Sequence, residues 1–208
     1  EQGNPNLQPQ FAHNIELTHS FKGILNTTLN YTKTNNIINE VLEQNTDRNE
    51  TFVKKANIAK QRQFGLAISA NGQIKKWWTG NIYANVYNNL FEGIINGDFV
   101  NISATTAQFN ASSQFKLDKT WGAEISGFYR TPGVDGVFKI QSLGMMNMGF
   151  SKQVWKGKGT FRLSMRDVLY SQKAKGNIKY SNIDASFQQR RDSRQVALGF
   201  TYRFAKGK

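Results

Sequence analysis

The sequence of 208 residues contains no cysteine, which excludes disulfides, thiolate metal sites and a cysteine nucleophile. No run of about 18 apolar residues occurs, so a transmembrane helix is excluded as well. With 38% hydrophobic residues and a mean hydropathy of -0.55, the chain is polar for its length. Acidic residues are also few, with 14 Asp and Glu against 27 Lys and Arg. Helical periodicity is almost absent, which leaves β-structure as the expected class.

Alternation of apolar and polar residues is the pattern that the sequence does contain. In the stretch 64–91, Phe64, Leu66 and Ile68 alternate with polar residues, and Trp78 and Ile82 resume the alternation after a short lysine-containing turn. This period of two predicts two long strands, each with one apolar and one polar face. The same pattern predicts nine long strands, at 11–21, 25–32, 63–74, 78–87, 106–117, 121–130, 138–154, 160–166 and 195–204.

Three environments can accommodate such strands: a soluble sandwich, a soluble lipocalin-like barrel and an outer-membrane barrel. Most of the predicted strands reach ten residues or more, which favours a membrane, because soluble strands usually have about five or six residues. All tryptophans lie beside short turns, as interface aromatics do in membrane barrels. These candidate interface residues are Trp77, Trp78, Trp121 and Trp155. We therefore expect an all-β, antiparallel, up-and-down transmembrane β-barrel.

The connections between the predicted strands differ at the two ends of the sheet. Those near 22–23, 75–77, 118–120 and 155–159 are short and carry lysines, which could meet anionic head groups or simply be solvated. The other connections, at 35–60, 92–100, 132–137 and 169–192, are mostly longer and carry most of the acidic residues. Segment 35–60 contains strand-like pieces, so we expect a projecting hairpin there.

Three segments resemble a known family of membrane proteins. The opening GNPNLQPQ at 3–10, the piece RLSMRDVLYSQ at 162–172 and the ending DSRQVALGFTYRF at 192–204 resemble the late strands of TonB-dependent receptors of the Bacteroidota type. Their order and spacing also match, although Gln10 stands where that family often has Glu. The resemblance implies that residues 1–208 are the C-terminal portion of a larger, 22-strand-type outer-membrane barrel.

The resemblance also implies a function, a location and partners. Such a receptor takes up a nutrient or a siderophore-type ligand across the cell outer membrane of a Gram-negative, Bacteroidota-like cell. Its plug domain, its TonB-contacting segment and its earlier strands are expected outside this sequence. The implied partners are outer-membrane lipid, the rest of the barrel and the plug, TonB, the barrel insertion machinery and, as a further candidate, a surface lipoprotein.

Two groups of residues receive expected roles from this comparison. The last strand resembles the terminal strand that the insertion machinery recognises, through Val196, Leu198, Phe200, Tyr202 and Phe204, which would also form a lipid-facing stripe. Side chains expected to face the barrel lumen are Tyr83, Tyr87, Arg130, Arg162, Arg166 and Arg203. Their substrate role in the family varies too much to be carried over, so no substrate-binding residue is assigned.

Other function classes have little support in the sequence. No catalytic residue, cofactor or metal site is expected, since His13 and His19 share one face without a third ligand and Walker spacing is absent. We expect the protein not to be an enzyme. Nucleic acid is not an expected partner, because the aromatics alternate within strands and form no stacking motif. Two alternatives stay open: a receptor-like barrel that serves as a structural or assembly subunit, and a soluble all-β lipid-binding protein.

Overall fold

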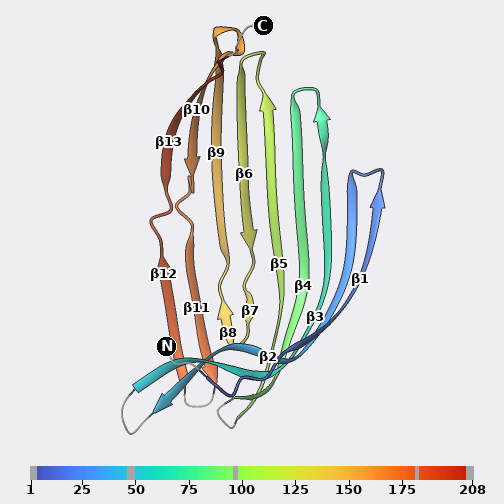
Figure 1. Ribbon diagram of the computed structural model, residues 1–208, viewed down its shortest axis with the longest axis vertical. Coiled ribbons are helices and arrows are strands. Elements are labelled where there is room, and N and C mark those ends of the chain that lie inside the picture. Colours follow the sequence, from blue (N-terminus) through green and yellow to red (C-terminus); the bar gives the residue numbers. More distant parts are fainter. Residues whose placement is uncertain (1–3, 46–49, 96–97, 181–182, 205–208) are drawn as a thin grey trace.

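A computed structural model describes residues 4–45, 50–95, 98–180 and 183–204 of the chain, almost all of them in antiparallel strands (Figure 1). The main sheet has nine strands in the order β1-β2-β3-β4-β5-β6-β9-β10-β13. A second sheet has four strands in the order β12-β11-β8-β7. The elements are β1 Phe11–Phe21, β2 Leu25–Asn45, β3 Glu50–Lys75, β4 Trp78–Ile95, β5 Asp98–Lys116, β6 Trp121–Arg130, β7 Gly133–Asp135, β8 Phe138–Ile140, β9 Leu143–Val154, η1 Trp155–Gly157, β10 Gly159–Arg166, β11 Lys173–Tyr180, β12 Ile183–Arg190 and β13 Gln195–Tyr202.

The four-stranded sheet prolongs the last four strands of the main sheet. Along the chain β6 leads into β7, β8 into β9, β10 into β11 and β12 into β13, and the strand order is the same in both sheets. Figure 1 shows each of these pairs nearly in line, with a break between its members. The molecule therefore has a short-turn end, where the tight connections and η1 lie, and a long-strand end, where the prolonged strands lie.

Strands β2 and β3 form a hairpin that is much longer than its neighbours. Beyond Asn35 its register shifts twice, and Asn36 has a positive φ of 53°. This β-bulge reverses the side-chain alternation, so that Thr34 before it and Ile37 and Val41 after it face the same side of the sheet. Figure 1 shows the hairpin bending across the long-strand end beyond the bulge.

The hydrophobic core lies where this hairpin meets the other strands at the long-strand end. Val41 of β2, Val100 of β5, Val137 of the β7–β8 turn and Ile178 of β11 are buried together. The β7–β8 turn approaches β2 so closely that a Cβ on Gly136 would lie 2.1 Å from Nδ2 of Asn39. The core therefore stabilises one end of the sheet and leaves the broad faces of the main sheet uncovered.

The opening segment ties the long hairpin to the first strand. Asn57 of β3 accepts a hydrogen bond from the backbone N–H of Gln8 and donates one to its carbonyl, both at 2.8 Å. Asn4 donates to the carbonyl of Lys55 at 2.9 Å. Oε1 of Gln10 accepts a hydrogen bond from the N–H of Ile38, next to the bulge. A glutamate at position 10 has the same acceptor oxygen, so the Gln-for-Glu difference preserves this contact.

The structure confirms the all-β, antiparallel class and a main sheet of nine strands. The strand expected at 138–154 is divided into β8 and β9, which belong to different sheets, and the connection expected at 132–137 contains β7. The structure also confirms a hairpin within 35–60, although this hairpin packs across the other strands instead of projecting freely. Our expectation that 92–100 and 169–192 are loops was wrong, because β4, β5, β11 and β12 extend through most of these ranges. Within the described ranges, no helix has the length and apolarity needed to cross a membrane.

Candidate functional site

The main sheet has one continuous apolar face, which we call the outer face. It arises because the strand register places apolar residues opposite one another across neighbouring strands. Leu17, Leu29, Leu66 and Val86 form one such row across β1 to β4. A second row, across β6, β9, β10 and β13, is formed by Ala123, Phe150, Leu163 and Leu198. Many of these side chains are largely exposed, Leu17 to 68% and Leu198 to 76%, so this face needs an apolar surrounding.

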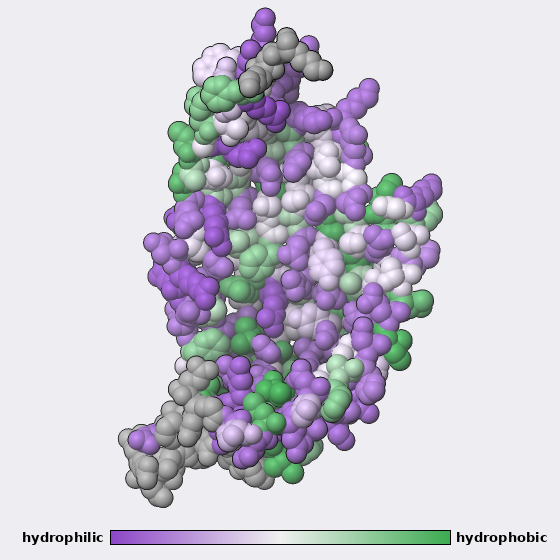
Figure 2. Space-filling model, viewed as in Figure 1, coloured by the Kyte–Doolittle hydropathy of each residue, from purple (hydrophilic) through white to green (hydrophobic). Residues whose placement is uncertain are grey.

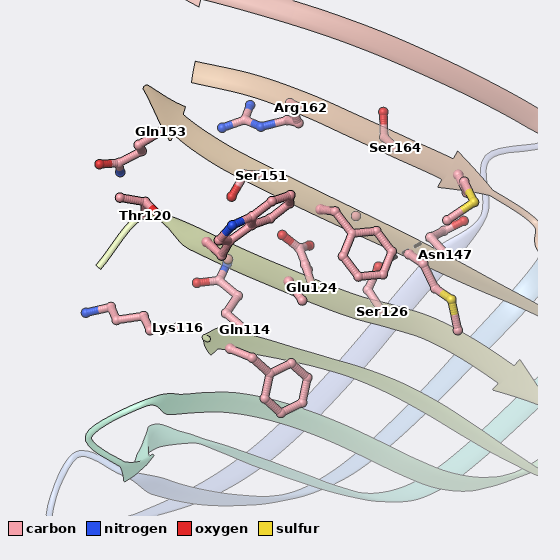
Figure 3. A pocket seen from close by; sticks show the side chains of 18 of the residues that line it. Gln114, Lys116, Thr120, Glu124, Ser126, Asn147, Ser151, Gln153, Arg162 and Ser164 are labelled. Atoms are coloured by element: carbon pink, nitrogen blue, oxygen red, sulfur yellow. Dashed lines mark hydrogen bonds between the residues drawn. The ribbon is translucent and has the colours of Figure 1, made fainter. Parts of the chain in front are cut away.

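The opposite, inner face is polar and hollow. It bounds a cavity of about 1030 Å³ between the last strands, near the short-turn end. In the view of Figure 2, purple and pale residues predominate over the middle strands. Figure 3 shows the side chains that reach into the cavity from β5, β6, β9 and β10. They include Gln114, Lys116, Glu124, Ser126, Asn147, Ser151, Arg162 and Ser164.

Buried polar atoms without protein partners occur on this inner face. Register pairs Asn85 with Gln108 and Gln108 with Arg130, so the three side chains form one row across β4, β5 and β6. Oδ1 of Asn85 and Nε of Arg130 are buried with no hydrogen-bond partner in the structure. Buried polar groups are nearly always satisfied in folded proteins, so these atoms indicate contact with water or with further polar groups on this side.

Five of the six residues expected to face the lumen occur on the inner face. Arg162 and Arg166 line the cavity, and the alternation of β4 and β6 places Tyr83, Tyr87 and Arg130 on the same face. Arg203 follows β13, and its backbone N–H donates to the carbonyl of Lys158. Glu124 shares this face with Arg130, but the two form no ion pair among the described residues.

Aromatic and lysine side chains cluster at the short-turn end. Trp77 and Trp78 stack on each other and on Phe115 with ring centroids 6.1 Å apart. Lysine ammonium groups lie over several rings, for example Lys152 over Trp121 at 4.6 Å and Lys75 over Trp77 at 5.8 Å. Trp residues beside lysines are typical of the interface between hydrocarbon and head groups.

The tight β5–β6 turn at this end depends on Asp118. Its carboxylate accepts hydrogen bonds from the backbone N–H groups of Thr120 and Trp121 and from the hydroxyl of Thr120. These bonds hold the pKa of Asp118 below its ordinary value, and the bond from the Thr120 backbone N–H has the largest effect. The turn places Trp121 at the start of β6 and Asp118 at the rim of the polar cavity.

The terminal strand presents a packed aromatic stripe on the outer face. The ring of Phe200 lies 4.7 Å from that of Phe161 and 5.6 Å from that of Trp155. The rings of Tyr202 and Phe204 lie 4.8 Å apart, and Phe204 is 89% exposed. Val196 and Leu198 continue the stripe toward the long-strand end. All residues of β13 are exposed, and among the described strands only β10 pairs with it.

Asp167 joins the two sheets, a role that the sequence did not indicate. It is fully buried between β10 and β11 and accepts hydrogen bonds from the backbone N–H groups of Ser171 and Gln172 and from the hydroxyls of Ser171 and Ser193. Burial raises the pKa of this carboxyl. The hydrogen bonds, of which the one from Ser193 has the largest effect, together lower the pKa by more than burial raises it, so the net pKa lies below the ordinary value. Asp167 thus connects the breaks before β11 and before β13.

Sequence reasoning also missed a cluster of cations around Tyr170, next to Asp167. Lys173, Arg190 and Arg194 all lie over its ring. Lys173 begins β11, Arg190 ends β12 and Arg194 precedes β13, so only the pairing of β11 with β12 and of β10 with β13 brings them together. His13 and His19 lie on exposed β1, and in the described part of the chain no three His, Asp or Glu side chains converge as metal ligands would.

An apolar outer face, a hollow polar inner face and an aromatic rim are the features of a β-barrel that spans an outer membrane. Consistent with this class, residues 1–202 match the outer membrane protein beta-barrel family. The chain belongs to that family, and it is an outer-membrane β-barrel protein. Nothing matches among curated proteins or among solved structures.

Proposed function

We propose that these strands form part of the barrel of a TonB-dependent receptor that takes up a nutrient or a siderophore-type ligand through the outer membrane of a Bacteroidota-like cell. The observation that carries the proposal is the hollow polar inner face with its cavity of about 1030 Å³, opposite an apolar outer face. Support also comes from the three segments that resemble late strands of such receptors. The first of these segments contains Gln8, whose backbone N–H donates to Asn57 of β3, and the second contains Asp167.

Unpaired edges support a barrel larger than nine strands. Among the described strands, β1 and β13 each pair with one neighbour, and both are exposed along their whole length. In hydrocarbon an unpaired strand edge leaves backbone N–H and C=O groups without partners, at a cost of several kcal/mol each. Closure by further strands of the same protein satisfies both edges, and a 22-strand-type barrel is wide enough to hold a plug.

The polar inner wall suits a plug domain as its inner neighbour. Lys116, Arg162 and Arg166 line the cavity, and no carboxylate forms an ion pair with them among the described residues. A polar domain within the barrel would supply acceptors for these cations and for Nε of Arg130, and a donor for Oδ1 of Asn85. In this arrangement the long-strand end, with its hydrophobic core, lies outside the cell, and TonB acts from the short-turn side.

A photo-crosslinking amino acid at Ser126 or Ser164 in the full-length protein tests this proposal in cells. Both side chains reach into the cavity (Figure 3), so we expect crosslinks within the same polypeptide, to a plug, and a changed pattern in cells without TonB. The same amino acid at Ile68, on the outer face, is the matched control and should give none of these crosslinks. Crosslinks from the cavity positions to a separate protein only, unaffected by TonB, would instead support an assembly subunit.

The aromatic stripe of the terminal strand makes a second test. We expect Tyr202→Ala combined with Phe204→Ala to lower the amount of folded protein in the outer membrane several-fold, because in the role that the resemblance implies the insertion machinery recognises these exposed aromatics. Heat-modifiable migration on a gel measures the folded fraction. Thr201→Ala with Arg203→Ala, at the alternate positions, is the control. An undiminished folded band in the aromatic variant would refute the recognition role.

A further inference from the structure

Three cationic side chains surround one aromatic ring where β10 passes into β11. Nζ of Lys173 lies 5.8 Å from the ring centroid of Tyr170, and the Cζ atoms of Arg190 and Arg194 lie at 4.6 Å and 4.8 Å. Nη2 of Arg194 also donates to the carbonyl of Val168 at 3.2 Å, which fixes this guanidinium. In the described part of the chain, no carboxylate pairs with any of the three cations. Such a cluster repels itself and attracts an anion.

The cluster faces outward, just beyond the apolar band of the outer face. Lys173 pairs with Arg190 across β11 and β12, on the face opposite to Ile178, which belongs to the inner core. Arg194 precedes Val196 by two residues, and Val196 pairs with Met165 in the last apolar pair of β10 and β13. Two residues span about 7 Å of a strand, which is the distance from hydrocarbon to head groups. The cations thus lie at head-group depth.

An apolar groove begins beside the cluster and runs over the main sheet. It has a volume of about 690 Å³, and Leu169 and Ser171, the neighbours of Tyr170 in sequence, line one end of it. Ala111 and Gly127, which pair with each other across β5 and β6, are small residues on the outer face and leave room for the groove there. Larger side chains on the same face flank them: Phe109, Ile125, Tyr129 and Met146.

We propose that the Tyr170 cluster and this groove bind one phosphorylated lipid of the outer leaflet, lipid A in its chemistry. Its phosphate is held by Arg190, Arg194 and Lys173, and an acyl chain lies in the groove. A guanidinium presents a planar pair of N–H donors that matches phosphate oxygens, and an acyl chain fits the apolar wall. The inference rests on the proposed function only for the orientation of the protein in the membrane, in which the long-strand end lies outside the cell.

Nanodiscs of phosphatidylcholine containing a small fraction of lipid A test the site with the full-length protein. Native mass spectrometry counts the lipid A molecules that stay bound on release from the disc. Arg190→Gln with Arg194→Gln should reduce lipid A retention roughly tenfold, as expected for the loss of charge-assisted hydrogen bonds. The control, Lys22→Gln with Lys75→Gln, removes two cations that also lie over aromatic rings, but at the short-turn end, and should retain lipid A like the wild type.

The outcomes separate the lipid site from its alternatives. Equal losses in both double variants would overturn the inference, because they would reveal a general effect of charge. Displacement of lipid A by inorganic phosphate at comparable concentration would also overturn it, since the acyl chain would then contribute nothing. Wild-type protein that enters nanodiscs but retains no lipid A refutes the lipid site alone. Failure to enter them would instead count against membrane placement itself.

Discussion

Ile82→Arg is expected to destabilise the folded barrel by about 2–4 kcal/mol, the cost of an arginine on the lipid face near the bilayer midplane. Ile82 is 50% exposed and lies in β4, midway between Trp78, at the aromatic rim, and Val86. Its cross-strand neighbours, Ala70 and Ala111, are too small to shield a charge. Equilibrium unfolding by urea of the full-length protein in lipid vesicles measures the change in free energy.

The adjacent residue provides a matched control for this prediction. Asn81 precedes Ile82 on the same strand, faces the inner side and pairs with Asn71 and Ser112. Asn81→Arg introduces the same side chain into a wet, polar surrounding and should change the free energy of unfolding by less than about 0.5 kcal/mol. If the two variants were equally stable, the outer face would not meet hydrocarbon. If Asn81→Arg were the more damaging, the faces would be reversed.

The strands and their faces could be predicted because period-two alternation reflects a physical boundary. A residue such as Leu66 is apolar, and Ala67 and Ser69 beside it face the other way, because each strand separates two media along its whole length. The alternation also sets the register, since a slip by one residue would turn the apolar set inward. This is why nine strands and the position of the aromatic rim follow from residue order alone.

The long-strand end could not be predicted, because there the alternation is broken by local backbone geometry. Asn36 adopts a positive φ, which Asn tolerates better than most residues, and the resulting bulge turns Ile37 and Val41 inward. Nothing in the composition of 35–60 marks that reversal. The Asp167–Ser193 contact likewise joins residues 26 apart in sequence, and it exists only because β11 and β12 pair between them.

Asp167→Ala should detach the second sheet from the main sheet, with a loss of about 3 kcal/mol or more in local stability. The substitution leaves the buried N–H groups of Ser171 and Gln172 and the hydroxyl of Ser193 without their acceptor. It also places alanine at a φ of 47°, a region that Asp and Asn tolerate better. Hydrogen exchange of the full-length protein in nanodiscs measures this as lost protection of the β11 and β12 amides, with β4 and β5 unchanged.

Two control variants accompany this experiment. Asp167→Asn removes the charge but keeps the shape of the side chain, and Asp184→Ala removes a carboxylate elsewhere on the same sheet. Asn keeps an acceptor oxygen and tolerates the backbone, so Asp167→Asn should lose much less protection than Asp167→Ala. Asp184, on the same sheet, forms an ion pair with Lys179 at an exposed site, and Asp184→Ala should leave protection unchanged. Loss of protection in Asp184→Ala equal to that in Asp167→Ala would contradict the role assigned to the buried carboxylate.

Acidification gives an independent test of the same carboxylate. The pKa of Asp167 in the folded protein lies below its ordinary value of about 3.9, so its contribution to stability is complete above that value. The contribution decreases as the pH falls through the folded-state pKa, because the neutral acid accepts the hydrogen bonds of Ser193 and Ser171 less strongly. Protection of β11 and β12 in the wild type should therefore decline below about pH 4 relative to β4 and β5. In Asp167→Asn this relative decline should disappear, and its persistence there would assign the acid sensitivity to another group.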